Sequence, residues 1–434
     1  MFIRYIAPVP ARVLPIRFAA WVILPSFLAA LCSAATAADG PLTLEGAQQR
    51  AIERSRLLTA KDYAVRASRE QAVAAARLPD PILKLGVDNL PIEGPDRFST
   101  TRDFMTQRRI GLMQDFPRAD KRRLRAERFE READKTLAEK TAAAAAIERD
   151  TAVAWLERSY LEAMAAMVAE QQHQAGLEVM AAEAAYRGGR GAQADVFAAR
   201  AEAITLADRT SELQRRIANA RLALARWIGE AAQLPLADRQ VMDAVPLEPE
   251  TLETRLGHHP ELAVLRKQED IAATDAALAR ADKKADWSVE LAFMQRGPAY
   301  ANMVSVGVSV PLQWNQGNRQ DREVAARLAQ LEQAKAESED ALRTHVAEVG
   351  AMLNEWQDNR TRQSRLEKDL LPLAQARTAA AVAQYRGGKM PLAEVLGARR
   401  SELDARLQVL QLEADTARLW AQLRFLVPAH RGQQ

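Results

Sequence analysis

A fifteen-residue motif with an acid and an arginine at fixed positions occurs twice in this sequence, 199 residues apart. The copies, residues 186–200 and 385–399, align without a gap and share eight identical residues. The charged pair is Asp195 and Arg200 in the first copy, and Glu394 and Arg399 in the second. Such side chains can form ion pairs or cap the positive end of a helix. The repeat indicates an internal duplication.

Both copies open with Tyr-Arg-Gly-Gly, between two long helical patterns. A glycine pair lets the chain leave a helix through positive φ and turn back. We therefore expect two hairpin tips, at 187–193 and 386–391. A plain turn is the simpler interpretation, but turn chemistry alone does not require the Asp/Glu-Val-x-x-Ala-Arg that follows. The tip residues are Tyr186, Arg187, Gly188 and Gly189, and Tyr385, Arg386, Gly387 and Gly388.

Residues for catalysis or cofactor binding are not evident. The sequence has neither a phosphate-binding Gly-x-x-x-x-Gly-Lys-Ser/Thr nor an acid–base cluster, so we expect no catalytic residue, no cofactor and no enzymatic activity. Only His258 and His259 of the five histidines are adjacent. A His-His pair before a proline is interpreted as a helix entry or surface feature, and no metal site is predicted.

The N-terminus has the layout of a secretory signal peptide, predicted at residues 1–37. Three arginines precede an apolar run over 18–31, and Ala35-Thr36-Ala37 follows. The one cysteine, Cys32, leaves with this segment unless it is lipidated. That alternative stays open because Cys32 follows an apolar run, although Leu31 stands where a lipobox has a small side chain.

Charge balance argues against nucleic acid as the main partner. Without the three signal arginines, the remaining 57 basic residues equal the 57 acidic ones, and phosphate binding needs a basic surplus. Beyond the signal no apolar stretch reaches 18 residues, so no transmembrane helix is expected.

Long helices dominate the remaining pattern. No proline occurs between Pro117 and Pro235, and residues 118–186 predict one helix of about 100 Å at ~1.5 Å per residue. In a second long helix, 319–385, an apolar stripe from Val324 to Trp356 has steps of three and four, typical of a coiled coil or long bundle. Pro372 should break or kink it. Shorter helices are expected at 194–228 and 392–426.

Four segments alternate apolar with small or polar residues, as strands do. They lie near 82–90, 106–116, 287–295 and 302–311. Such alternation is typical of a transmembrane β-barrel strand, although half-buried strands of a soluble sheet show it too. Because about eight strands are the minimum for a barrel with an interior, four per chain require an oligomer.

The predicted organisation is two structural repeats, 38–228 and 261–427, joined by a proline-rich segment at 229–260 that packs around the middle of the helices, with a tail at 428–434. The fold class is mainly α with a small β part. Long α-helical hairpins and four barrel strands are expected in each chain of an oligomer.

This order of elements resembles the TolC family of outer-membrane efflux channels over about residues 42–427. Besides the two tips, the anchors are Gln114-Asp115-Phe116-Pro117 with Lys121-Arg122, Val310-Pro311-Leu312 with Gly317-Asn318-Arg319, and His259-Pro260-Glu261-Leu262.

The resemblance implies a homotrimer whose strands form a pore among outer-membrane lipids and whose helices form a tunnel across the periplasm. Its tips would dock a periplasmic adaptor protein that is bound to an inner-membrane RND-type pump. Asp195 and Glu394 are then candidates for the periplasmic aperture, and Arg200 and Arg399 for a latch between neighbouring chains. A ring of carboxylates would favour cations; simple helix capping is the alternative.

Residues 78–81, 89–91 and 105–117 look similar to the branch that serves heavy-metal cation pumps, which implies metal cations as cargo. Drugs or other small molecules remain an alternative, as does a structural coiled-coil protein of the envelope. A periplasmic adaptor is a further alternative, but it would carry one hairpin and not a duplicated chain.

Overall fold

The computed structural model describes residues 40–240, 242–245, 252–257 and 259–426. The predicted signal peptide with Cys32, His258 and the predicted tail lie outside the described residues. Residues 41–434 form one compact unit, and the description below concerns that unit.

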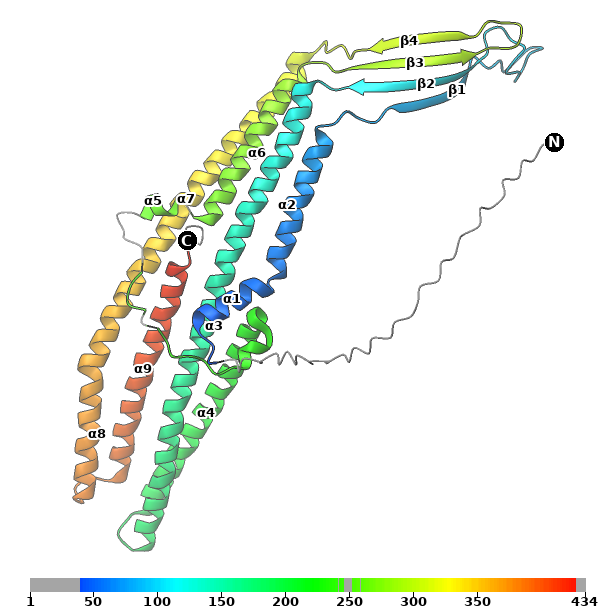
Figure 1. Cartoon of the computed structure of the whole chain (residues 1–434). Helices are drawn as coiled ribbons and strands as arrows, with labels where there is room; N and C mark the ends of the chain where they lie inside the picture. Colours follow the sequence, from blue (N-terminus) through cyan, green and yellow to red (C-terminus); the bar gives the residue numbers. More distant parts are fainter. Residues whose placement is uncertain (1–39, 241, 246–251, 258, 427–434) are drawn as a thin grey trace, which may run out of the picture. The chain divides into compact units, whose positions relative to one another are not determined.

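The fold is mainly helical with one small antiparallel sheet, and its two halves have the same order of elements (Figure 1). Each half has a helix, two strands, a long helical segment and a returning helix. The first half comprises α1 (Leu44–Arg54), α2 (Arg56–Ala75), β1 (Ile82–Asp88), β2 (Gln107–Phe116), α3 (Ala119–Arg187) and α4 (Gln193–Ile228). The second comprises α6 (Pro260–Asp282), β3 (Trp287–Gln295), β4 (Met303–Ser309), η3 (Gln316–Asn318), α7 (Gln320–Arg365), η4 (Leu366–Leu370), α8 (Leu371–Arg386) and α9 (Leu392–Arg424).

Helix α3 is the element around which the others are arranged. It contacts α1, α2, α4, α6 and α9. Its 69 residues are mostly strong helix formers without proline, so nothing in its interior interrupts the hydrogen-bond ladder. The alanine-rich stretch 142–147 is half-buried or buried throughout, as expected for small side chains that let several helices approach.

The second long helical segment changes its hydrogen-bonding pattern at Pro372. Helix α7 passes into the π-helical turn η4, and α8 follows with Pro372 in its first turn. Proline lacks an N–H, and its ring collides with the carbonyl four residues earlier. The wider turn before Pro372 relieves this conflict, so the chain continues as a helix to the second tip.

The predicted apolar stripe of the second long helix is confirmed. Ala334, Val349, Leu353 and Trp356 are buried, and the other stripe positions are half-buried. Val349, Leu353 and Trp356 pack against α5 (Leu252–Leu256) and the end of α9.

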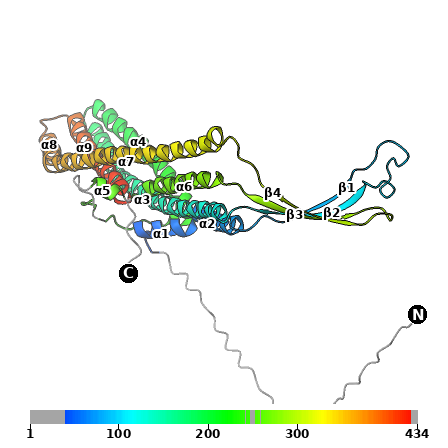
Figure 2. The ribbon, with the colours of Figure 1, turned by 90° about the horizontal axis from the view of Figure 1, so that it is seen from above.

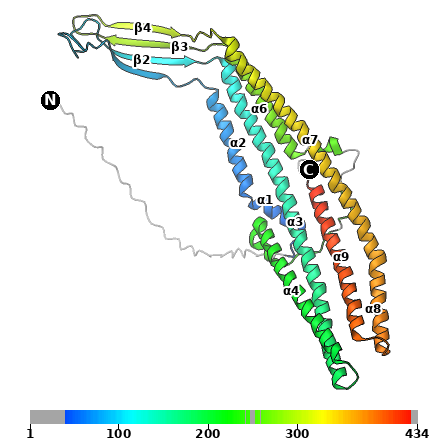
Figure 3. The same cartoon turned by 180° about the vertical axis from the view of Figure 1, so that it is seen from behind.

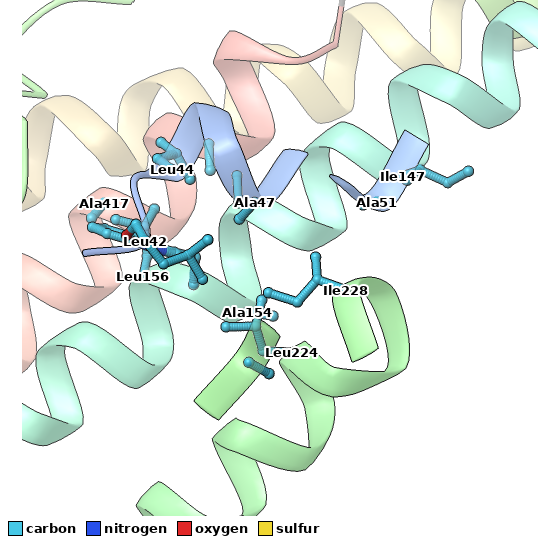
Figure 4. Packing of buried hydrophobic residues seen from close by; sticks show 14 of the residues in the cluster. Leu42, Leu44, Ala47, Ala51, Ile147, Ala154, Leu156, Leu224, Ile228 and Ala417 are labelled. Carbon is cyan, nitrogen blue, oxygen red and sulfur yellow. Dashed lines mark hydrogen bonds between the residues drawn. The ribbon is translucent and has the colours of Figure 1, made fainter. Parts of the chain in front are cut away.

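The main core lies where α1, α3, α4 and α9 meet (Figure 4). Buried Trp155 donates from Nε1 to the Leu42 carbonyl at 3.0 Å. Buried Arg158 donates to the carbonyls of Ala232, in η1 (Gly229–Gln233), and Leu234, at 2.7 and 2.9 Å. The bonds of Arg158 hold the start of the segment between the repeats, Ala232 and Leu234, against the middle of α3.

The four strands form a single sheet in the order β1-β2-β3-β4, all antiparallel. The β2–β3 pairing joins the two halves, and Phe116 stacks on Trp287 with ring centroids 4.5 Å apart. Figures 2 and 3 show the strands extending away from the helix ends instead of lying against them. At the base, buried Lys121 of α3 pairs with Asp286 at 3.1 Å and Asp282 at 3.4 Å.

Among the described residues, no helix combines the length and the apolar character needed to cross a membrane.

Candidate functional site: two hairpin tips and an exposed apolar sheet face

The two tips are the same helix-ending turn. Gly189 and Gly388 both have φ of +70°, a conformation that favours glycine. In the first tip Arg190 N–H donates to Ala185 O at 2.9 Å and Gly189 N–H to Tyr186 O at 3.0 Å. The second tip repeats both bonds, from Lys389 to Gln384 and from Gly388 to Tyr385, each at 2.9 Å. This pair of bonds defines the Schellman motif, so the predicted hairpin turns are confirmed.

Both tips are exposed to solvent and stand on a shared apolar base. Tyr186 and Tyr385 expose 47% and 36% of their surface, and both glycine pairs and the adjacent arginines are also exposed. Below them, one cluster from α3, α4, α8 and α9 is formed by Ala182, Val196, Ala199, Ala381, Leu392, Val395, Leu396 and Ala398. The repeated Val and Ala of the motif are therefore core residues, which explains their identity by packing.

The two motif acids have different surroundings. The Asp195 carboxylate, in the first turn of α4, accepts from Ala192 N–H at 3.4 Å, so it caps that helix. Glu394 occupies the same position in α9, but the residue three places earlier is Pro391, which has no N–H to donate. Glu394 is exposed, its backbone N–H donates to Pro391 O at 3.3 Å, and its carboxylate forms no hydrogen bond or ion pair with other residues that the structure describes.

The two motif arginines also differ, although each pairs with a carboxylate of α3 in the same chain. Arg200 pairs with Glu183 across its own hairpin at 2.6 Å, and the hydrogen bond from Arg200 lowers the pKa of Glu183. Arg399 reaches across to Glu178 and so joins the second repeat to the first. Burial raises the pKa of Glu178, against the opposing charge of Arg399.

Three residues that connect the repeats were missed by the sequence analysis. Glu178 and Glu202 are largely buried carboxylates, with side-chain exposures of 16% and 8%. Arg400 donates from Nε to Glu202 Oε2 at 3.0 Å. No local signal in the sequence indicated these pairs, because their members come from different helices that meet only in the fold.

One face of the sheet is apolar and exposed. Ile110, Leu112, Leu291 and Phe293 of the two central strands lie in register across the β2–β3 pairing. The exposed fractions of these four side chains lie between 43% and 54%. The outer strands add Leu83, Leu85, Val87, Val304, Val306 and Val308, all exposed. A contiguous apolar face of this kind marks a surface that something else covers.

The opposite face is polar and carries its own ion pairs. Lys84 Nζ lies 2.6 Å from Glu290 Oε2. Arg109 lies 3.6 Å from Asp88 and 3.7 Å from Glu290. Small residues, among them Gly86, Gly111, Ser305 and Gly307, lie on the same face, together with Ile82 and three methionines, Met113, Met294 and Met303. The predicted alternation is therefore confirmed in the middle of the sheet, with large apolar side chains on one face and mainly charged or small ones on the other.

This fold is shared with known outer-membrane proteins. The outer membrane protein VceC of Vibrio cholerae aligns with a TM-score of 0.71 at 19% identity, over 89% of this chain and 96% of VceC. CusC, described with transmembrane channel formation, aligns with a TM-score of 0.73 at 17% identity, over 88% of this chain and 91% of CusC. The chain thus has the fold of the outer-membrane channel proteins built from long helical hairpins.

Sequence comparison adds a family match over the second repeat and one full-length relative. Residues 251–427 match the family Outer membrane efflux protein. The chain is 26% identical to the cobalt-zinc-cadmium resistance protein CzcC of Cupriavidus metallidurans, over 93% of this chain and 96% of CzcC. The second repeat thus matches the outer membrane efflux protein family, in agreement with the resemblance of the tips and strand–helix junctions.

Proposed function

We propose that this protein is the outer-membrane duct of a tripartite efflux system and that its cargo is heavy-metal cations. The observation that carries the proposal is the sheet with one exposed apolar face and one charged face. In a barrel wall the first face would meet lipid and the second would line water.

Four strands cannot enclose a pore by themselves, because about eight are needed to leave an interior. Each of the edge strands β1 and β4 has a partner on one side only within the described sheet, and open strand edges do not occur within the hydrocarbon of a membrane. Three copies would join these edges into a closed wall of twelve strands, so the proposed unit is a homotrimer.

The hairpin tips are the proposed docking surface for a periplasmic adaptor protein, which would connect the duct to an inner-membrane RND-type pump. Their exposed tyrosines and arginines suit this role, since these residue types are enriched where proteins bind each other. The tips lie at the opposite ends of the helices from the sheet (Figure 1), as a passive duct from the periplasm to the outside requires.

The cargo assignment rests on the similarity to CzcC, a cobalt-zinc-cadmium resistance protein. Its test is a host that lacks its own channel, complemented with this gene and the matching pump and adaptor. We expect restored tolerance to cobalt, zinc or cadmium salts. Restored tolerance to organic compounds alone would contradict the metal assignment and leave the duct in place.

The duct itself is tested by a matched pair of lysine substitutions in β4. Val306→Lys places a charge on the apolar face, which costs about 2–4 kcal/mol at the middle of a bilayer, whereas Ser305→Lys places it on the polar face. We expect Ser305→Lys, but not Val306→Lys, to give an SDS-resistant trimer in outer-membrane fractions. Equal assembly of both variants, or a wild-type protein found as a soluble monomer, would overturn the proposal.

Asp195 and Glu394 are the proposed aperture residues. Three copies of each carboxylate around a narrow axis would attract cations. Asp195→Asn combined with Glu394→Gln should alter the cation preference or conductance of single channels in planar bilayers. Unchanged currents would reduce Asp195 to a helix cap and remove Glu394 from the aperture.

A further inference from the structure

Two histidines and a glutamate meet where the start of α6 packs against the middle of α7. His259 precedes α6, Glu261 lies in its first turn, and His345 comes from α7. One potential ligand atom from each residue lies within 4.8 Å of the other two. His259 is buried and Glu261 is exposed, so the cluster extends from the interior to the surface.

The distances approach those of a metal site. His345 Nε2 lies 3.3 Å from Glu261 Oε2, and two ligands of a tetrahedral zinc ion are about 3.3 Å apart when their bonds are ~2.0–2.1 Å long. The two imidazole rings have centroids 5.0 Å apart at 36°. The ligand atom of His259 lies within 4.8 Å of the other two, so its ring would have to move closer for all three to bind one ion.

The second nitrogen of His345 has the partner that metal-bound histidines usually have. His345 Nδ1 lies 3.7 Å from Glu348 Oε2, one helical turn further along α7. This distance is slightly longer than a hydrogen bond, and a carboxylate that closed it would hold the proton on Nδ1 and leave Nε2 free to bind an ion. Glu348 would thus orient His345 without touching the metal.

His259 has a second task in the absence of an ion. Its Nδ1 accepts from the N–H of Glu261 at 3.3 Å and caps α6, and burial lowers its pKa and favours the neutral ring. Because a neutral imidazole has one free nitrogen lone pair, it cannot accept this bond and bind an ion together. Ion binding would therefore replace the cap of α6.

We propose that His259, Glu261 and His345 form a binding site for one divalent transition-metal ion of the zinc type, with water in the fourth position. Two imidazoles and one carboxylate suit zinc, cobalt or copper better than magnesium or calcium, which prefer oxygen ligands alone. The ion would join the start of the second repeat to α7. The site is independent of the cargo, since neither the tips nor the sheet contributes to it.

The test is zinc titration calorimetry on the full-length protein, purified without a polyhistidine tag and treated with chelator. We expect one zinc ion per chain, with binding weakened at least tenfold in His345→Ala and in Glu261→Gln. His259→Asn removes the imidazole but keeps a residue that caps helices well, so it should also weaken binding without loss of helical circular dichroism. Glu348→Gln should weaken it about tenfold.

His173→Ala is the matched control, because His173 is exposed on α3 and lies outside the cluster. Cobalt provides a second readout, since its visible absorption reports coordination by nitrogen and oxygen ligands. Zinc affinity that is unchanged in His345→Ala and Glu261→Gln, or no binding by the wild type, would overturn the proposal and leave an ion pair between His345 and two glutamates. Metal export is not measured, so failure of the proposed function would leave this result unaffected.

Discussion

The two hairpins of this chain end in the same turn but are held by different contacts. Arg200 pairs with Glu183 within its own hairpin, whereas Arg399, its counterpart, pairs with Glu178 of the other repeat. The reason is one substitution between the repeats: the position equivalent to Glu183 is Val382, which offers no carboxylate. The two copies have thus kept the residues that form the hairpin turn and differ in the residues that select its ion-pair partners.

The acids show the same divergence. Ala192 gives Asp195 an N–H to accept from, and Pro391 gives Glu394 none. The first acid is therefore committed to its helix, while the second remains available to a partner or an ion. The following predictions test this difference between the hairpins, from the largest expected effect to the smallest.

Arg399→Ala should destabilise the chain more than Arg200→Ala. Loss of Arg399 leaves Glu178 largely buried without its partner, which should cost about 2 kcal/mol. Glu183 is more exposed, with a side-chain exposure of 32%, so water can replace Arg200 and the loss should be small. Thermal unfolding followed by circular dichroism measures both; equal losses would contradict the distinction.

Gly189→Ala and Gly388→Ala should cost the same, about 1 kcal/mol each. Both glycines have φ of +70° with open space around the added Cβ, so strain in the left-handed conformation is the only cost. Gly387→Ala is the control, because its φ is −79°. A much larger loss at one tip, or a loss at Gly387, would show that the turns are not equivalent.

Asp195→Ala should destabilise by about 0.5 kcal/mol through loss of the cap, and Glu394→Ala should change stability by less. Asp195→Asn keeps an acceptor for Ala192 and should recover most of the loss. Unfolding midpoints of the three variants check this. A greater loss from Glu394→Ala would reveal a contact that only the assembled protein makes.

Mild acid should separate Glu178 from Glu183. The pKa of Glu178 is raised above its usual 4.5, so the folded chain takes up this proton first and gains stability as the pH falls toward 4.5. The pKa of Glu183 is lowered, so its contribution is lost as the pH falls below 4.5. Unfolding midpoints measured across this pH range check both effects. In Glu178→Gln the gain in stability toward pH 4.5 should disappear, and in Glu183→Gln the loss of stability below pH 4.5 should disappear. Identical profiles would contradict these assignments.

Local patterns were enough to predict the long helices, the tips and the four strands. The absence of proline in α3, the glycine pairs and the period-two alternation each act over a few residues, so one sequence reveals them. The same holds for Pro372, although its result, a π-helical turn that lets the helix continue, depends on how the neighbouring backbone relaxes.

Contacts between distant residues could not be predicted in this way. Nothing near Arg399 in the chain indicates Glu178, and nothing near His345 indicates His259 and Glu261. Residues 259 and 345 meet only because α6 and α7 pack together after the chain has passed through two strands. The His258-His259 pair was interpreted as a helix entry, and His259 does cap α6. That His345 also lies beside His259 is visible only in the tertiary structure.

The sequence alone determined which segments are helix and strand, where the chain turns, and that one sheet face is apolar, because these depend on backbone stereochemistry and side-chain period. Tertiary structure decided that β2 and β3 join the halves into one sheet, that one arginine of the repeat changes partner, and that two histidines meet a glutamate. These depend on helix packing, which brings together residues that have no relation along the chain.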